Sequence, residues 1–195
     1  MLHSHSHSNF QFLSNTLKTC LSLLCVYFLM ISPDVIAEPS QEERKLFNLL
    51  NAYRVSHGLP EIALSASLTL VAQTHVRDLS DNLPEGQCNM HSWSASGQWS
   101  ACCYTPDHAQ SRCMWNKPRE LTGYKGHGYE ITFGGADGYQ ANADAALEGW
   151  INSSAHQAVM LNKAVWQGRQ WRAVGVGIYK GYAAVWFGSD ADPDS

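Results

Sequence analysis

The sequence predicts one α+β domain that is fastened by disulfides and closed by a C-terminal β-hairpin. Three observations lead to this class: segments with the apolar spacing of amphipathic helices, two β-rich runs near the C-terminus, and four cysteines between positions 88 and 113. After the first 37 positions, 158 residues remain, which is the length of one domain with an ordinary hydrophobic core.

The first 37 residues have the pattern of a secretory signal peptide. Lys18 precedes an almost purely apolar run from Cys20 to Ile31, and the small-residue ending Val35-Ile36-Ala37 follows. A basic flank, a short apolar run and an A-x-A-like end are the parts of such a signal. A membrane anchor is the competing interpretation, but a spanning helix needs ~20 apolar residues. We therefore expect removal of residues 1–37, which leaves 38–195 as one secreted or periplasmic domain without a transmembrane anchor.

Two helices are expected at the start of the mature chain. Ser40 followed by acidic residues is a helix start, and apolar residues then recur every three or four positions until His57-Gly58. A glycine at this place is a common helix stop. The second helix is expected to begin near Ser65 or Ser67 and to end before Asn82.

Residues 84–127 show no sustained periodicity, and a loop this long argues against a compact domain unless cross-links order it. Cys88, Cys102, Cys103 and Cys113 are even in number, so two disulfides are expected in an oxidising compartment. A bridge between the adjacent Cys102 and Cys103 would be strained, so each is expected to pair with Cys88 or Cys113. A four-cysteine zinc site is the alternative, but its usual C-x2-C spacings are absent.

The remainder of the chain alternates helices and strands. The expected elements are a short helix at 94–100, a strand at 128–133, a helix from Asn142 or Asp144, a further helical turn within 153–162, and strands at 172–179 and 182–187. The turn Lys180-Gly181 joins the last two strands into a hairpin. The acidic tail, residues 189–195, is expected to be frayed.

Composition excludes one class of partner. After position 37 the chain holds 12 Lys and Arg against 16 Asp and Glu, without a basic stripe, so binding to nucleic acid has no electrostatic support. All seven tryptophans also fall in this part. A tryptophan-rich core is the simpler interpretation, and an aromatic-lined groove for lipid or sugar is the alternative.

Several short sequence motifs, in this order, resemble those of the CAP superfamily, which comprises cysteine-rich secretory proteins, antigen 5 and pathogenesis-related proteins, together with bacterial SCP-like members. The motifs are Leu50-Asn51-Ala52-Tyr53-Arg54, His91-Ser92-Trp93, Trp150-x-x-Ser153-x-x-His156, Met160-Leu161-Asn162 and Val174-Gly175-Val176-Gly177. The resemblance implies a three-layer α-β-α sandwich with a central cleft. In the family this cleft holds two histidines and two acidic residues, which bind a divalent metal in some members.

The resemblance implies that the cleft contains His91, Glu130, Trp150, Ser153 and His156. Glu130 stands one place later than the family's first acid, so a strict strand register would turn it to the wrong face unless a bulge or shift restores it. Ser153 replaces the second acid. His91, His156 and Glu130 would be a reasonable set for Zn²⁺ with an open fourth position, and the missing carboxylate would make binding weak. The bland alternative is that both histidines are hydrogen-bonded and brace loops.

Three functions from different classes are consistent with these residues. The leading hypothesis is a secreted binding protein whose ligand is a lipid, a glycan, or an envelope or host protein. The second is a zinc-dependent hydrolase of peptide or cell-wall bonds that uses His91, Glu130 and His156. A Ser153–His156 nucleophilic pair would also need an orienting acid and an oxyanion hole. The third is a domain that acts through its disulfide-rich loop, residues 88–113.

Overall fold

The computed structural model describes residues 38–193, and the expected signal peptide lies outside them. The elements are α1 (Gln41–Ser56), α2 (Ala66–Asp81), α3 (Ser111–Trp115), α4 (Lys117–Leu121), β1 (Gly128–Gly134), α5 (Ala143–Ile151), α6 (Ser154–Met160), the short 3-10 helix η1 (Ala164–Trp166), β2 (Ala173–Tyr179) and β3 (Tyr182–Gly188). Within residues 38–193, no helix has both the length and the apolar character needed to cross a membrane.

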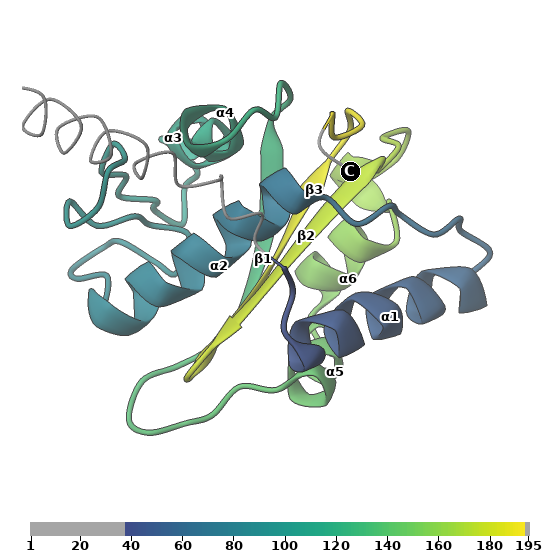
Figure 1. Cartoon of the computed structure of the whole chain (residues 1–195), viewed down its shortest axis with the longest axis horizontal. Coiled ribbons are helices and arrows are strands. Elements are labelled where there is room, and N and C mark those ends of the chain that lie inside the picture. The colour runs from purple at the N-terminus through teal and green to yellow at the C-terminus, as the bar shows by residue number, and fades with distance from the viewer. Residues whose placement is uncertain (1–37, 194–195) are drawn as a thin grey trace, which may run out of the picture. The chain divides into compact units, whose positions relative to one another are not determined.

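The three strands form one antiparallel sheet in the order β1-β3-β2. The last strand of the chain is therefore the central one, and β1 and β2 are edges. Figure 1 shows the sheet between two helical layers, with α1, α5 and α6 on one side and α2 on the other. The predicted three-layer sandwich and the C-terminal hairpin are both confirmed.

The layers are joined by Glu43, a buried residue in the first turn of α1. Its carboxylate accepts a hydrogen bond from the Ser40 backbone N–H (2.7 Å), and Ser40 Oγ accepts one from the Glu43 N–H (3.2 Å), which forms a capping box. The same carboxylate accepts bonds from the Ile178 N–H on β2 and from Gln73 Nε2 on α2, both at 2.9 Å. One capping residue thus links α1, α2 and the sheet.

Close contact between α2 and β2 depends on two glycines. A Cβ atom added at Gly175 would lie 2.0 Å from the carbonyl carbon of Leu68, and one added at Gly177 would lie 2.5 Å from that of Ala72. Real Cβ atoms do not approach backbone atoms this closely, so any larger residue at these positions would push the helix off the sheet. These glycines belong to the Val-Gly-Val-Gly motif.

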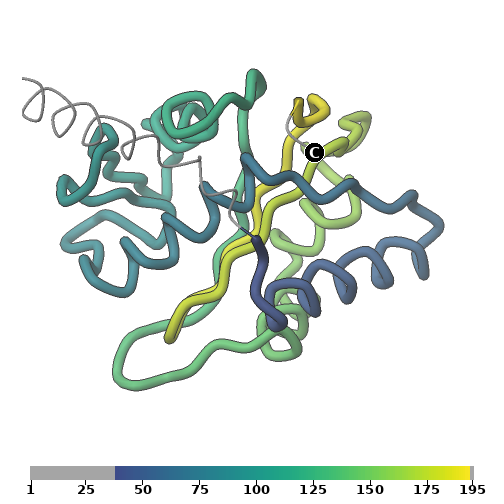
Figure 2. The backbone as a smooth tube through the Cα atoms, viewed as in Figure 1, coloured from purple at the N-terminus to yellow at the C-terminus, as the bar shows by residue number. Residues whose placement is uncertain are grey.

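Two disulfides order the long segment between α2 and β1, whose path is visible in Figure 2. They join Cys88 to Cys103 and Cys102 to Cys113, so each of the adjacent cysteines pairs with a distant one, as expected. All four cysteines that were considered for zinc are therefore consumed in disulfides.

The helix expected at 94–100 is wrong. Trp93 and Cys102 exchange two backbone hydrogen bonds of 2.7 and 2.9 Å, so the residues between them form the loop of a small antiparallel bridge. The Asp78 carboxylate, at the end of α2, accepts a bond from the Ser94 N–H at 2.8 Å. The short helices of this segment lie later, at α3 and α4.

The expectation of a frayed tail is also wrong for the residues up to 193. Asp192 is buried, and its carboxylate accepts hydrogen bonds from Ser67 N–H (2.9 Å), Ser67 Oγ (2.9 Å) and Ser65 Oγ (2.5 Å). A carboxylate at a helix N-terminus also interacts favourably with the helix dipole. Asp192 therefore fixes the tail to the start of α2.

Candidate functional site

A groove with a volume of about 490 Å³ lies beside β1. Its lining residues are Met90, Thr132, Phe133, Gly134, Gly135, Tyr139, Gly149, Trp150, Ser153 and His156. The strand supplies one wall, and the end of α5 with the start of α6 supplies the other. Because β1 is an edge strand, no further strand of residues 38–193 covers this side of it.

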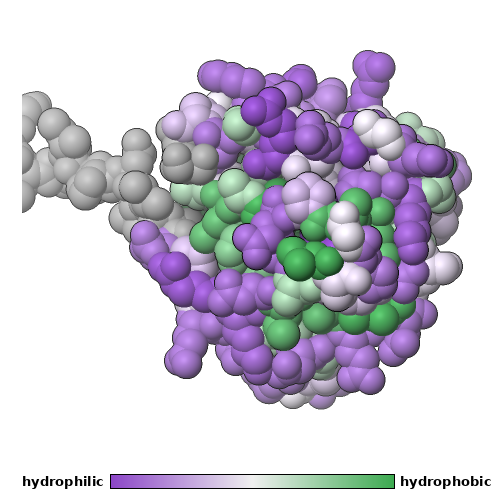
Figure 3. Space-filling view, turned by 90° about the vertical axis from the view of Figure 1, so that its right-hand side faces the viewer, coloured by the Kyte–Doolittle hydropathy of each residue, from purple (hydrophilic) through white to green (hydrophobic). Residues whose placement is uncertain are grey.

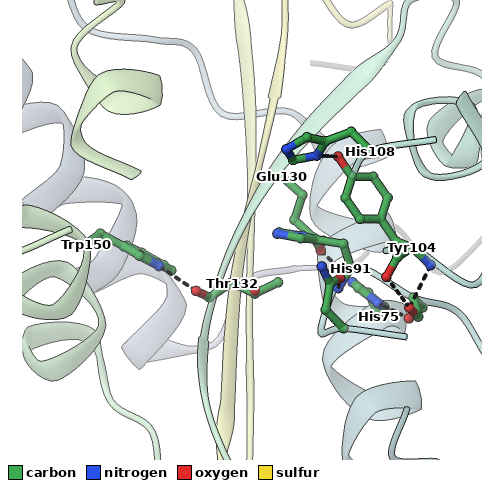
Figure 4. Close-up of polar contacts among 9 residues, drawn as sticks. His75, His91, Tyr104, His108, Glu130, Thr132 and Trp150 are labelled. Carbon is green, nitrogen blue, oxygen red and sulfur yellow. Dashed lines mark hydrogen bonds and ion pairs between the residues drawn. The ribbon is translucent and has the colours of Figure 1, made fainter. Parts of the chain in front are cut away.

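Trp150 fixes the distance between these two walls. Its side chain is fully buried, and its indole Nε1 donates a hydrogen bond of 2.9 Å to the backbone carbonyl of Thr132, as Figure 4 shows. The bond satisfies a carbonyl of the edge strand that points away from the sheet. Trp150 thus attaches α5 to β1 at the base of the groove.

Next to the groove, Glu130 is held between two histidines (Figure 4). Its Oε1 lies 2.5 Å from His75 Nδ1 and its Oε2 lies 2.8 Å from His91 Nδ1. The pairing of β1 with β3 is continuous from Gly128 to Gly134, so no bulge reorients the strand. Glu130 therefore faces the two histidines in the regular strand register. Tyr129, which stands at the position of the family's first acid, faces the core on the opposite side of the sheet.

Contacts of His75 favour its charged form. Its two ring nitrogens face the Glu130 carboxylate and the Ser92 carbonyl (2.9 Å), and a neutral imidazole has only one N–H to donate. The ring also stacks on Trp93 at a centroid distance of 4.3 Å, a geometry that favours a cation. Burial disfavours this charge, but Glu130 and the Ser92 carbonyl outweigh it and raise the pKa of His75. Burial likewise opposes the charge on Glu130, and the two histidines overcome it and lower the pKa of that carboxyl.

His156 and Ser153 are two of the polar residues that line the groove. Burial, with added repulsion from His91, lowers the pKa of His156, so this imidazole is neutral at pH 7. Ser153 is the N-cap of α6, but its hydroxyl makes no hydrogen bond within residues 38–193, to His156 or to any other group. The two side chains therefore do not form a nucleophile–base pair, which requires such a bond.

The residues expected to hold zinc do not assemble as a metal site. Both oxygens of Glu130 are engaged by histidines, and His91 uses its Nδ1 in one of these contacts. In the described part of the chain, no group of three His, Cys, Asp or Glu side chains has an arrangement that could hold a metal ion. Two imidazoles without a coordinating carboxylate are a poor match to the three protein ligands of a catalytic zinc.

The sequence analysis did not connect His75 to Glu130, its partner in the structure. Its position on the buried face of α2 was readable from the helical period, but the partner came from 55 residues away. Tyr104 was also missed. It is buried with its ring 5.3 Å from that of His91, and its hydroxyl lies 2.8 Å from Nδ1 of the exposed His108.

None of the seven tryptophans is strongly exposed. Trp93, Trp150, Trp171 and Trp186 are buried, and Trp99, Trp115 and Trp166 are half-buried. Five large apolar side chains of the described residues are exposed, and they are scattered over separate elements, with Tyr139 the member that borders the groove. Figure 3 shows one side of the domain, where hydrophobic residues lie among a hydrophilic majority. Four tryptophans thus belong to the core, and the other three pack against its margin with part of each side chain exposed.

The sequence profile of the cysteine-rich secretory protein (CAP) family matches residues 47–186. A comparison with curated protein sequences found no match.

Among solved structures, an extracellular protein containing an SCP domain from Bacillus anthracis has 23% sequence identity and a TM-score of 0.51. The match covers 75% of this chain and 40% of that one, so the chain spans less than half of the Bacillus protein. An outer surface protein from Borrelia burgdorferi has 15% identity and a TM-score of 0.51, with 77% of this chain and 95% of that one covered. At these identities the likeness concerns the fold.

Proposed function

Because this chain belongs to the cysteine-rich secretory protein (CAP) family, we propose that it is an exported binding domain whose groove beside β1 takes the apolar part of a lipid. The single observation that carries the proposal is the composition of the groove. Aromatic, methionine and glycine residues line most of it, and Thr132, Ser153 and His156 are its polar members.

Export is supported by the first 37 residues and by the disulfides. The signal-like pattern precedes the domain, and two disulfides are typical of an oxidising compartment. The similar Bacillus anthracis protein is described as extracellular. Whether the domain stays in a periplasm or leaves the cell is tested by fractionating cells that express the full chain.

A lipid fits the groove better than a glycan does. Sugar rings stack on exposed aromatic faces, but the tryptophans are all buried or half-buried, and Tyr139 is the one groove aromatic with substantial exposure, 42%. Phe133 and Met90 offer apolar atoms without polar partners, which suits a hydrocarbon chain. A volume of about 490 Å³ is also within the range of pockets for small ligands.

The neutral state of His156 selects the head group. A protonated histidine would attract a carboxylate, whereas a neutral imidazole and a serine hydroxyl exchange hydrogen bonds with an uncharged hydroxyl. We therefore expect a long-chain alcohol to bind at least as tightly as the fatty acid of the same length at pH 7.

The test uses displacement of a dansyl-labelled fatty alcohol from the protein. Gly135 lines the groove, has open space where a Cβ would stand, and has no positive φ, so Gly135→Leu can fill the groove without straining the backbone. Ala136→Leu is the matched control, because Ala136 is the next residue in the chain, is exposed and does not line the groove. We expect at least tenfold weaker binding in Gly135→Leu and unchanged binding in Ala136→Leu. Equal binding by all three proteins would remove the groove as the site.

The zinc-hydrolase alternative has less support, because both carboxylate oxygens of Glu130 are engaged by histidines. Calorimetric titration with Zn²⁺ addresses it directly. Saturable binding that is lost in a His91→Ala/His156→Ala variant would restore that alternative and justify an assay for hydrolysis.

A further inference from the structure

Three exposed arginines gather at the end of the sheet where β1 and β2 begin. They are Arg112 on α3, Arg119 on α4 and Arg169 in the segment before β2. The strand register sets Gly128 and Ala173 opposite the same residue of β3, Gly188, so the segments that precede β1 and β2 meet at this end. Figure 1 shows α3 and α4 beside the start of β1.

Aromatic rings hold these segments together. The ring of Tyr129, at the start of β1, has Trp115 of α3 on one side (centroids 5.5 Å apart) and Trp166 of η1 on another (5.1 Å). Arg169 lies over the Tyr129 ring at 4.5 Å and over the Trp166 ring at 5.5 Å. Its guanidinium is therefore fixed in place by stacking, and it keeps its N–H groups for another partner.

The other two arginines differ in how they are held. Arg119 Nε donates to the backbone carbonyls of Lys125 (2.7 Å) and Gly126 (3.1 Å), just before His127. This leaves its terminal N–H groups unused within residues 38–193. The Arg112 side chain makes no hydrogen bond or ion pair with any described residue.

Within residues 38–193 the positive charge of this cluster is not neutralised by an ion pair, although the Asp190 carboxylate lies close to Gly126, whose backbone carbonyl accepts a bond from Arg119. Ion pairs of the described residues involve other cations, and none includes Arg112, Arg119 or Arg169. His127, whose ring lies 6.2 Å from that of Trp115, responds to this field. Burial lowers its pKa, and repulsion from all three arginines lowers it further. The chain has a net charge of −4, so a local group of three arginines without ion pairs around one histidine differs in sign from the chain as a whole.

Covering of apolar surface by arginine side chains does not account for the cluster. That role fits Arg169, which stacks on two rings. Arg112 makes no side-chain bond with a described residue. Arg119 binds two loop carbonyls, and this role does not require two further cations nearby. Like charges placed together oppose folding unless something neutralises them. The arrangement is therefore expected to serve a ligand that is absent during folding.

We propose that Arg112, Arg119 and Arg169 form a binding site for a phosphate group on a ligand with a ring, which the half-exposed Trp115 and Trp166 contact. Arginine forks match the geometry of phosphate oxygens. A dianionic phosphate also matches three positive charges better than a single carboxylate does. This site lies on different residues from the groove beside β1, so it does not depend on the lipid proposal.

The experiment titrates the protein at low salt with inorganic phosphate, with phenyl phosphate and with phosphatidic acid vesicles, and follows tryptophan fluorescence and Tm. The site variant is Arg112→Gln/Arg119→Gln/Arg169→Gln. The control variant, Arg44→Gln/Lys45→Gln/Arg77→Gln, removes the same charge from other parts of the surface. Arg112→Glu is a second variant that loses no side-chain bond of the fold.

We expect phenyl phosphate to bind more tightly than inorganic phosphate, with affinity at least tenfold lower in the site variant and in Arg112→Glu than in the control variant. Binding of vesicles alone, lost in the same two variants, would also support the site and would identify a lipid head group as the source of the phosphate. Absence of binding to all three probes, or equal loss in the site and control variants, would overturn the proposal.

Discussion

Replacement of Glu130 by Gln tests whether a charged network holds the cleft histidines. Glu130 and His75 have fully buried side chains, and the carboxylate accepts from two histidines. An amide of the same shape cannot neutralise the His75 imidazolium, so the variant leaves an uncompensated buried charge or a buried histidine that has lost its proton. Breaking a buried pair by removing one partner costs about 3–5 kcal/mol. For a domain of this size, each kcal/mol lowers Tm by roughly 2–4 °C, so we expect a loss of roughly 6–20 °C.

The assay is thermal unfolding of wild type and Glu130→Gln across pH. The pKa of Glu130 is lowered from 4.5, so its contribution is present above pH 4.5 and is lost as the pH falls through the lowered value. The pKa of His75 is raised from 6.5, so its contribution is complete below pH 6.5 and is lost as the pH rises through the raised value. The difference between the two proteins should therefore be largest between pH 4.5 and 6.5.

Glu148→Gln is the control, because Glu148 is exposed on α5. This substitution removes the same charge without breaking a buried network. Its Tm should stay close to that of wild type. A Glu130→Gln protein as stable as this control, or a Tm difference that does not vary with pH, would refute the charged network.

The remaining predictions concern the tail, the α2–β2 contact and the groove. Asp192→Asn weakens hydrogen bonds to a charged group and should lower the free energy of unfolding by about 1.5–3 kcal/mol, measured by urea denaturation; no change would mean that the tail does not stabilise α2. Gly175→Ala should cost about 1–3 kcal/mol or more by the same assay, because its Cβ would meet the helix backbone, whereas Gly135→Ala has open space and should be neutral. NMR titration should give His156 a pKa below 6.5, and His91→Ala should raise it without restoring 6.5, since burial remains the larger cause. A His156 pKa that is unaffected by His91→Ala would contradict their electrostatic contact.

Elements with local signals were predicted well from the sequence. The N-caps Ser40, Ser65 and Asn142 each accept a bond from a backbone N–H of the first helical turn, so the helix starts were written in a few adjacent residues. The hairpin turn at Lys180-Gly181 is local in the same sense. Such features depend on short stretches of chain, so they can be predicted without knowledge of the fold.

Errors arose where a partner distant in sequence decides the structure. Residues 94–100 form a loop because Trp93 pairs with Cys102, and the tail is ordered because Asp192 meets α2. The charged pair in the cleft is of the same kind. His75 was visible as a buried helix residue, but the identity of Glu130 as its partner depends on how α2 crosses the sheet.

The central position of β3 has a consequence for the making of this protein. Neither β1 nor β2 has a strand to pair with until residues 182–188 have been synthesised. The hydrogen bonds between Asp192 and the start of α2 form later still. During synthesis the earlier helices consequently have no completed sheet to pack on. The domain is thus expected to fold after translation rather than progressively, a property that would suit the export proposed above. For the same reason, a premature stop codon near position 180 would abolish the whole domain instead of shortening it.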